Sequence, residues 1–277
     1  MTAVGSCLCL GIDPDPAALP RGLAAGLAGV ERLGRLVLEA AAPYAAAVKV
    51  NLAFFEAFGS AGLAALEQLR RAVPDDLPFI ADAKRADIGS TARRHAAALF
   101  DALGADAVTA NPYLGRDALE PFLARPDRFT YVLCRTSNPG AAAVQNLDVG
   151  GRPLYLRVAE LAAQWAGAEH NVGLVVGATA PVDMAAIRTT VPGLPFLVPG
   201  VGAQGGEIER VLANGPATTP PASRLPAGGL LVNVSRAITQ AVAEWPAGPG
   251  GDAAAAAALA RAAAEWSARL HVRSAAG

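Results

Sequence analysis

Four charged residues lie within six positions at the end of an apolar run, where Asp82, Lys84, Arg85 and Asp87 follow residues 77–81. Only 17% of the residues are charged, so this cluster stands out from the rest of the chain. Lysines fixed among carboxylates stay protonated and act as permanent cations in a partly dry site. Such cations suit a reaction that develops negative charge on carbon, because a lysine can then donate the proton. Taken singly, the same charges would be solvated turn residues or an ion pair closing a strand end.

A second lysine, Lys49, follows another short apolar run and can flank this cluster if the two strands are neighbours. Asp82 and Lys84 are two positions apart, so in an extended strand their side chains project from the same face. Asp87 and Thr91 are four positions apart, which predicts that they share one face of the helix that follows.

Short apolar or β-rich runs recur eight times, at residues 7–13, 46–51, 79–84, 107–111, 129–136, 172–178, 196–202 and 230–235. Segments with helical periodicity lie between them, at residues 31–42, 53–73, 91–103, 117–123, 154–165, 181–190 and 205–214. Near-continuously apolar strands, each followed by a helix, indicate a parallel sheet covered by helices. We therefore predict an α/β protein with one (β/α)8 TIM-barrel domain over residues 1–277, a length that this fold commonly has.

A doubly wound open sheet is the structural alternative, because Gly200, Gly202 and Gly205 match the GxGxxG pattern of dinucleotide sites. Such a site requires an acidic residue about twenty positions further on. No Asp or Glu occurs between Glu209 and Glu244. The pattern also follows the seventh predicted strand, and barrels often bind phosphate with the loops after strands seven and eight. We therefore reject the dinucleotide interpretation.

Polar residues follow most of the predicted strands, and in a barrel these strand ends open on one mouth. They are Asp13, Lys49, Asp82, Lys84, Asn111, Ser137, Thr179, Gln204 and Arg236. Arg236 follows the eighth strand, where paired guanidinium hydrogen bonds can clamp a phosphate opposite the glycine-rich loop. Elsewhere an arginine at a strand end is often only an ion-pair partner.

Composition excludes several other classes of protein. The formal net charge is −1, so no global field favours nucleic acid or an anionic membrane. No basic segment precedes the first apolar run, and the alanine-rich stretch 252–266 is broken by Arg261 and Glu265. We expect neither a signal peptide nor a membrane span, and we place the protein in the cytoplasm.

Cysteine and histidine give little support for a disulfide framework or a metal centre. Cys7, Cys9 and Cys134 are an odd set without CxxC spacing and are expected to be small buried hydrophobes. The three histidines form no HxH or HxxxH arrangement, although a carboxylate-bound Mg²⁺ remains open.

A proline- and glycine-rich insertion at residues 214–229 lies between a predicted helix and a predicted strand. This order places it at the end of the barrel opposite the strand-end residues. We expect it to be exposed and dispensable for catalysis. The alanine-rich stretch near the C-terminus predicts a surface helix.

The chain resembles the orotidine 5′-phosphate decarboxylase family, in particular the bacterial subgroup that carries DAKRADIGST. The family pattern DxKxxDIxxT is met at Asp82, Lys84, Asp87, Ile88 and Thr91. Six further segments are similar in order along the chain: GIDPDP, VKVNLAFFE, NPYLGRD, LCRTSNPGA, VPGVGAQGG and VNVSRAI. The DxKxxD core alone is shared with related sugar-phosphate enzymes, so these six segments make the resemblance specific.

The resemblance implies decarboxylation of orotidine 5′-monophosphate (OMP) to UMP, the last step of de novo pyrimidine synthesis, with no metal or organic cofactor. By this resemblance, Lys84 would stabilise and protonate the C6 carbanion, and Asp82 would lie beside the departing carboxylate. Lys49 would hold Asp82 and a ribose hydroxyl, and Asp13 would bind the ribose as well.

The same resemblance assigns the rest of the substrate. Ser137 would contact the pyrimidine, Pro199 would line its pocket, and Gln204 and Arg236 would bind the phosphate beneath a closing loop.

The resemblance further implies a homodimer with two shared sites. Asp87, Ile88 and Thr91 would reach into the site of the neighbouring subunit. Spacing alone shows only that Asp87 and Thr91 can share a helical face.

Two rival functions are weighed against this one. A sugar-phosphate decarboxylase or aldolase of the same superfamily would use the DxKxxD core with Mg²⁺ and an enediolate intermediate. In those relatives a glutamate ligand typically stands at the second strand, where this chain has Lys49, a cation where a metal needs an anion. A catalytically inactive module that senses UMP is the rival from another class, although the full set of catalytic residue types is present.

Overall fold

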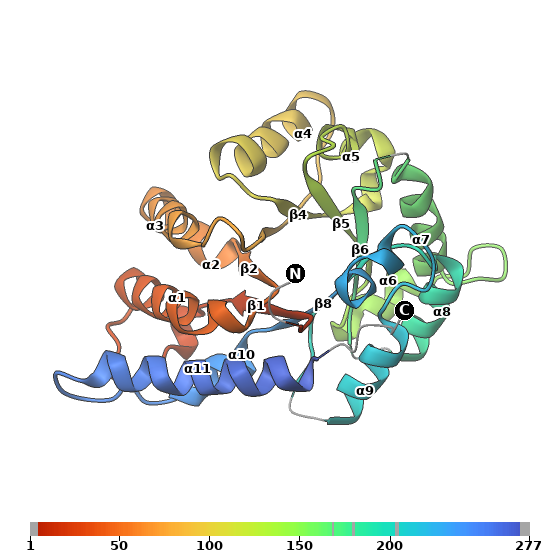
Figure 1. The fold of residues 1–277 in the computed structure, drawn as a ribbon. Helices are drawn as coiled ribbons and strands as arrows, with labels where there is room; N and C mark the ends of the chain where they lie inside the picture. The colour runs from red at the N-terminus through yellow and green to blue at the C-terminus, as the bar shows by residue number, and fades with distance from the viewer. Residues whose placement is uncertain (1–4, 168, 179–180, 203–204, 272–277) are drawn as a thin grey trace. The chain divides into compact units, whose positions relative to one another are not determined.

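Eight parallel strands follow one another in chain order in the computed structural model, which describes residues 5–167, 169–178, 181–202 and 205–271 (Figure 1). They are β1 (Leu8–Ile12), β2 (Ala47–Asn51), β3 (Phe79–Arg85), β4 (Ala107–Ala110), β5 (Phe129–Arg135), β6 (Val172–Val176), β7 (Phe196–Val198) and β8 (Leu230–Val234). Their order is that of a closed barrel, β1 to β8. The predicted (β/α)8 barrel is therefore confirmed.

Helices separate the strands throughout the described residues. They are α1 (Leu27–Ala41), α2 (Ala53–Glu56), α3 (Gly59–Ala72), α4 (Gly89–Ala96), α5 (Arg116–Leu123), α6 (Ala142–Gln145), α7 (Leu154–Trp165), α8 (Pro181–Thr190), α9 (Gly205–Asn214), α10 (Arg236–Thr239) and α11 (Gly251–Arg269). A π-helical turn, η3 (Ala97–Ala102), continues α4.

The segment 53–73, predicted as one helix, is two helices. The chain turns at Gly59, whose φ of +62° is a left-handed conformation that glycine adopts without strain. A Cβ at Gly62 would lie 1.9 Å from the carbonyl oxygen of Phe55, so only glycine lets α3 approach α2 this closely. The hydrophobic periodicity continues across this turn, which explains why it predicted an unbroken helix.

The described chain divides into two compact units, the first of which comprises residues 5–83 and 234–271. In it, β1 pairs with β2 and β2 pairs with β3, and the buried side chains of these strands pack beneath α1 and α3. Helix α11 lies along α1 (Figure 1). Leu259 and Trp266 of α11 are buried, so this alanine-rich helix forms part of the hydrophobic core of the unit.

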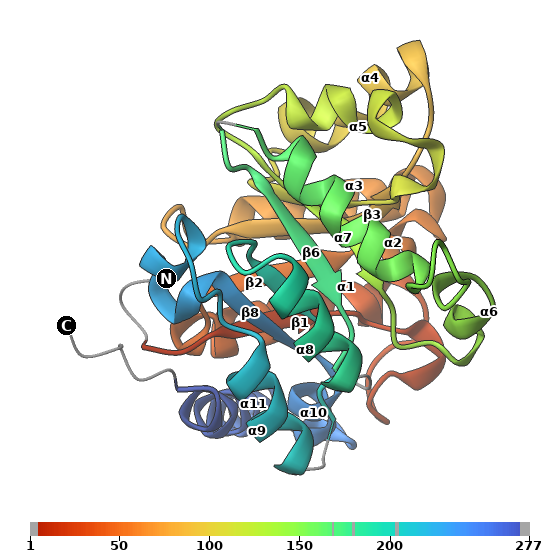
Figure 2. The ribbon, with the colours of Figure 1, turned by 90° about the vertical axis from the view of Figure 1, so that its right-hand side faces the viewer.

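The second unit comprises residues 84–233 of the described chain. Strands β4 to β8 pair in succession. Helix α7 packs against β5, β6 and α8, and Figure 2 shows α7, β6 and α8. The register between β5 and β6 shifts between Leu133 and Arg135. A register shift of this kind re-aims the side chains that follow it, and here it ends two residues before Ser137.

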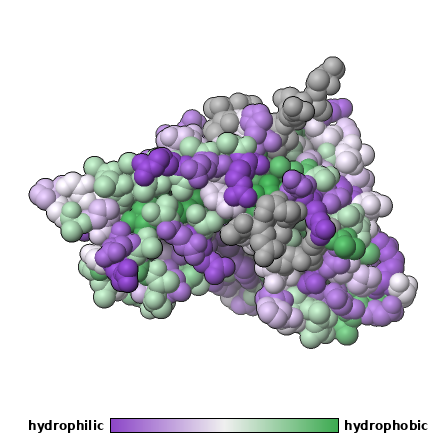
Figure 3. Space-filling model, turned by 90° about the horizontal axis from the view of Figure 1, so that it is seen from below, coloured by the Kyte–Doolittle hydropathy of each residue, from purple (hydrophilic) through white to green (hydrophobic). Residues whose placement is uncertain are grey.

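The face seen in Figure 3, from below in Figure 1 where α11 lies, mixes hydrophilic residues with weakly hydrophobic ones. Among the described residues, none of the helices is both long and apolar enough to cross a membrane.

The insertion at 214–229 is only partly exposed, contrary to the expectation that all of it faces solvent. Ala217 and Ala222 are buried, and the carbonyl of Gly215 accepts a hydrogen bond from the guanidinium of Arg188. This buried guanidinium also donates to the carbonyl of Leu194 and lies 3.6 Å from the ring centroid of Phe196. We therefore expect shortening of the whole segment to lower stability, while its dispensability for turnover stays a prediction.

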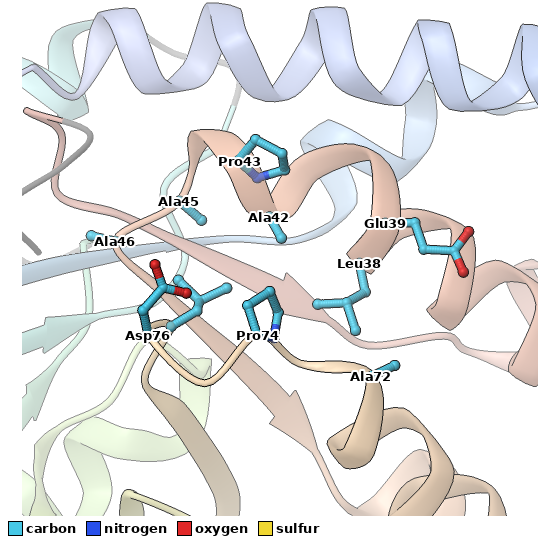
Figure 4. A pocket seen from close by; sticks show the side chains of 10 residues that line it. Leu38, Glu39, Ala42, Pro43, Ala45, Ala46, Ala72, Pro74 and Asp76 are labelled. Carbon is cyan, nitrogen blue, oxygen red and sulfur yellow. The ribbon is translucent and has the colours of Figure 1, made fainter.

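A cavity of about 300 Å³ in the first unit lies beside the residues that precede β2 and β3 (Figure 4). Ala45 and Ala46 line it before β2, and Leu77 lines it before β3. Its two carboxylates, Glu39 and Asp76, stand at opposite ends of the lining. Because active sites of barrels are built after the strands and not before them, we assign no chemistry to this cavity.

Candidate active site

A buried lysine between two carboxylates stands at the strand ends of the first unit. Lys49 aligns with Gly11 of β1 and with Ile80 of β3, and Asn51 aligns with Asp82. Because side chains alternate along each strand, Lys49 shares a face with Asp82 one pleat further on. Its four-carbon stem spans that step, and Nζ donates a hydrogen bond of 2.7 Å to Oδ2 of Asp82.

Asp13 completes this arrangement from the end of β1. Its Oδ1 lies 3.7 Å from Nζ of Lys49, which makes an ion pair without a direct hydrogen bond. The atom is buried and has no hydrogen-bond partner within the described part of the chain. A buried acceptor without a partner is uncommon in proteins, so this oxygen is available to a hydroxyl of a bound ligand.

Two opposing effects set the charge of Lys49. Burial alone lowers its pKa, because a low-polarity interior disfavours the ammonium. The negative charges of Asp13 and Asp82, with the hydrogen bond to Asp82, outweigh that effect and raise the net pKa above the usual value of a lysine. Lys49 is therefore a permanent cation at neutral pH.

The backbone at Lys84 is left-handed, with φ of 48°. The alternation of an extended strand, which predicted a common face for Lys84 and Asp82, therefore does not apply at this residue. A non-glycine residue in this conformation costs roughly 1–2 kcal/mol. Its amide is held from β4, because N–H of Lys84 donates 2.9 Å to Oγ1 of Thr109, a buried residue. Strain that neighbouring residues impose on a single lysine is typical of a functional position.

The expectation that Asp87 and Thr91 share a helical face is wrong for Asp87. Helix α4 begins at Gly89, so Asp87 precedes it, and Oδ1 of Asp87 accepts a hydrogen bond of 2.8 Å from the amide of Ile88. Gly89 has φ of +55°, and this turn separates Asp87 from the helix. Thr91 lies in α4 and is exposed, and the side chain of Ile88 is 58% exposed.

Ser137 lies close to the ends of β6 and β7. A Cβ on Gly177 would stand 3.0 Å from the backbone nitrogen of Ser137, and one on Gly200 would stand 3.5 Å from its Oγ. Pro199 immediately precedes Gly200, and its carbonyl accepts 3.0 Å from the amide of Ala178. The structure thus brings Ser137 and Pro199 into one region of the second unit.

Of the two residues predicted to bind phosphate, the structure describes only Arg236. Arg236 is the first residue of α10, directly after β8, and is exposed. Before it, Oγ of Ser235 is buried without a hydrogen-bond partner in the described chain. Gln204 lies outside the described residues.

Comparison with known proteins supplies the family. The model of the orotidine 5′-phosphate decarboxylase / HUMPS family matches residues 6–244, which is most of the chain. The chain belongs to this family. An orotidine 5′-phosphate decarboxylase of Herpetosiphon aurantiacus is 52% identical over 213 residues, covering 76% of this chain and 80% of that protein.

A second relative and a solved structure are also similar to this chain. An orotidine 5′-phosphate decarboxylase of Thermomicrobium roseum is 49% identical, with 85% of this chain and 82% of that protein covered. The structure of Leishmania donovani OMP decarboxylase is 41% identical with a TM-score of 0.75, and the match covers 97% of this chain and 95% of that one. The chain is thus an orotidine 5′-phosphate decarboxylase, a carboxy-lyase of pyrimidine biosynthesis.

Several polar residues of this decarboxylase were not found from the sequence. Thr109 is a polar residue inside the buried strand β4, and that contrast with its apolar neighbours was a usable signal. Gln145 and Asp183 gave no such signal, because each is an ordinary polar residue on a helix. Both side chains hydrogen-bond to Arg135, which belongs to another element of the second unit.

Proposed function

We propose that the enzyme converts OMP to UMP and CO₂ by electrostatic stabilisation of a C6 carbanion, without metal or organic cofactor. The bond between C6 and the carboxylate breaks, its electron pair stays on C6, and CO₂ leaves. Lys84 stabilises this carbanion and gives it a proton, and solvent then restores the proton to Lys84. Asp82 lies beside the departing carboxylate, Lys49 holds Asp82, and Asp13 binds the ribose.

The observation that carries this proposal is the ion array of Lys49, Asp13 and Asp82. The ammonium is held in place before substrate arrives, so no reorganisation is needed as charge develops. A divalent cation would require the position between the two carboxylates that the ammonium of Lys49 already occupies. Lys84 is joined to the array by one intervening residue, Ala83, and its strained backbone restricts where its side chain can go.

The other predicted site residues are assigned to the base and to the phosphate of the nucleotide. We propose that Ser137 and Pro199 receive the pyrimidine and that Arg236, with Gln204, binds the phosphate. Phosphate is remote from the bond that breaks, so its binding energy can organise the charged residues around C6.

A direct test is to incubate the purified enzyme with OMP and to follow both the loss of OMP absorbance and the release of CO₂. The proposal predicts one CO₂ for each UMP formed. Protein that binds UMP yet releases no CO₂ from OMP would instead be a nucleotide-binding module.

We also propose a homodimer in which Asp87, Ile88 and Thr91 complete the site of the partner subunit. Ile88, Tyr113 and Leu114 are large apolar side chains that are exposed in the second unit. A subunit interface over these side chains would remove their apolar surface from water.

Subunit complementation tests this shared site. If one subunit supplies Lys84 and the other supplies Asp87, a heterodimer of Lys84→Ala and Asp87→Ala subunits contains one intact site. Because half of randomly mixed dimers are heterodimers, unfolding and refolding the two inactive variants together should restore about a quarter of wild-type activity. Mixtures that stay inactive, although each variant alone sediments as a dimer, would show that both residues serve the same subunit.

We place the enzyme in the cytoplasm. All three cysteines are free and buried, and burial raises the pKa of Cys7 and of Cys9 to about 12, so both stay as neutral thiols. Unpaired cysteines suit a reducing compartment.

A further inference from the structure

One side chain, that of Gln145, holds the turn that carries Ser137. Its Oε1 accepts hydrogen bonds from the amide of Thr136 (2.9 Å) and from Nη1 of Arg135 (3.2 Å). Its Nε2 donates 2.8 Å to Oγ1 of Thr136, which in turn donates 2.6 Å to Oδ1 of Asn138. One amide therefore fixes both the backbone and the side chain of the residue before Ser137.

An ion pair anchors the same turn to two helices. Nε of Arg135 donates 2.8 Å to Oδ2 of Asp183 on α8, and the hydroxyl of Tyr155 on α7 donates 3.2 Å to the other oxygen of that carboxylate. The two charged side chains are 13% and 25% exposed, so water screens this pair less than a surface pair. Burial and then the charge of Asp183 raise the pKa of Tyr155, which keeps its hydroxyl protonated as a donor.

Gly177, which directly follows β6, also confines Ser137. The amide of Gly177 donates 2.7 Å to the carbonyl of Arg135. The missing side chain of Gly177 leaves just enough room for Ser137, since a Cβ there would stand 3.0 Å from both its nitrogen and its Cβ. Ser137 is thus held from β6 on one side and through Gln145 on the other.

We propose that Gln145 is a positioning residue that sets how tightly the enzyme binds the pyrimidine base. It acts through Ser137 and does not touch the substrate. A group held in its bound position before binding loses little conformational entropy when the ligand arrives, so its hydrogen bond contributes more to affinity. The inference rests on the proposed contact between Ser137 and the pyrimidine.

The surroundings of Gln145 make this role separable from overall folding. It ends a four-residue helix, and residues 142–144 and 146–150 around it are exposed. Removing its amide should therefore loosen this loop and leave the buried strands intact.

The test compares two competitive inhibitors of OMP decarboxylation: UMP, which has the base, and ribose 5-phosphate, which lacks it. Gln145→Met keeps the length of the side chain and removes all three hydrogen bonds. We expect its inhibition constant for UMP to rise about tenfold or more, because the order around Ser137 is lost. The constant for ribose 5-phosphate should stay within about twofold, because that ligand makes no base contact.

Two further variants and one control variant extend the comparison. Gln145→Glu keeps an oxygen that accepts from Thr136 and Arg135, so it should retain most of the affinity for UMP. Gly177→Ala pushes Ser137 directly and should show the same selective loss as Gln145→Met. Gly250→Ala, whose added Cβ would meet no atom within 4 Å, is the matched glycine control and should bind both ligands normally.

The outcomes are distinguishable. Equal losses for UMP and ribose 5-phosphate in Gln145→Met, or an unchanged UMP constant, would overturn the positioning role alone. An unchanged UMP constant in Ser137→Ala would remove the contact on which the role depends. Wild-type enzyme that neither decarboxylates OMP nor binds UMP would overturn the proposed function, and the inference with it.

Discussion

Lys84→Ala is expected to lower kcat for OMP by at least about 10⁴-fold, because one change removes both the cation proposed to stabilise C6 and the proposed proton donor. Affinity for UMP should fall less than about tenfold, since the proposed ribose and phosphate contacts do not involve Lys84. Steady-state kinetics and UMP titration of the same preparation separate the two effects. Lys49 and Lys84 are the only lysines in the chain, so no other side-chain ammonium can substitute.

Two arginine variants are the controls for this result. Arg261→Ala removes a cation from the exposed side of α11 and should leave kcat within about twofold, as surface substitutions usually do. Arg236→Ala should raise KM more than it lowers kcat, because its proposed partner is the phosphate. Near-normal turnover in Lys84→Ala would remove Lys84 from the role of proton donor.

Lys49→Met is expected to lower both stability and turnover. The substitution leaves the buried Asp82 and the partly buried Asp13 without their cation. Breaking a buried pair typically costs about 3–5 kcal/mol of unfolding free energy. Turnover should fall at least about a hundredfold, since Asp82 loses the group that holds it. Urea denaturation and OMP kinetics measure the two effects.

The double variant Lys49→Met with Asp82→Asn separates the structural effect from the chemical one. Removing both members of the pair should restore part of the stability but none of the turnover. If turnover recovers together with stability, the array serves folding and not catalysis.

The pH dependence of the stability lost in Lys49→Met follows from the raised pKa of Lys49. A lysine whose pKa is higher in the folded state contributes its full stability below the unfolded value of about 10.4 and loses it as pH rises through the folded value. The stability difference between wild type and Lys49→Met should therefore be constant from about pH 7 to about pH 9 and should shrink only above about pH 10.

Most of the barrel could be predicted because its signals are local. All eight strands lie where apolar runs predict them, and α7, α8 and α9 have the predicted bounds. The largest strand error is β7, which ends at Val198 and not at residue 202. Pro199 lacks a backbone donor and Gly200 has φ of +87°, so the extended conformation cannot continue there.

The site was less accessible from the sequence. Spacing and strand order were enough to suggest that Lys49 flanks Asp82, because parallel neighbours bring their ends together. The left-handed backbone of Lys84 could not be anticipated, since its amide bonds to Thr109, which is 25 positions away on another strand. Gln145 was missed for the same reason, because its proposed role depends on folded contacts to the turn at Thr136.

In the proposed mechanism, fixed ammonium groups among carboxylates, and no metal, drive the decarboxylation. The most direct measurement is the rate of OMP absorbance loss with enzyme stripped of metal and kept in EDTA. We expect the full wild-type rate, no increase on adding excess Mg²⁺, and no rescue of Lys84→Ala by Mg²⁺. Activity that EDTA abolishes and Mg²⁺ restores would contradict this account and favour a metal-dependent decarboxylase of the same superfamily.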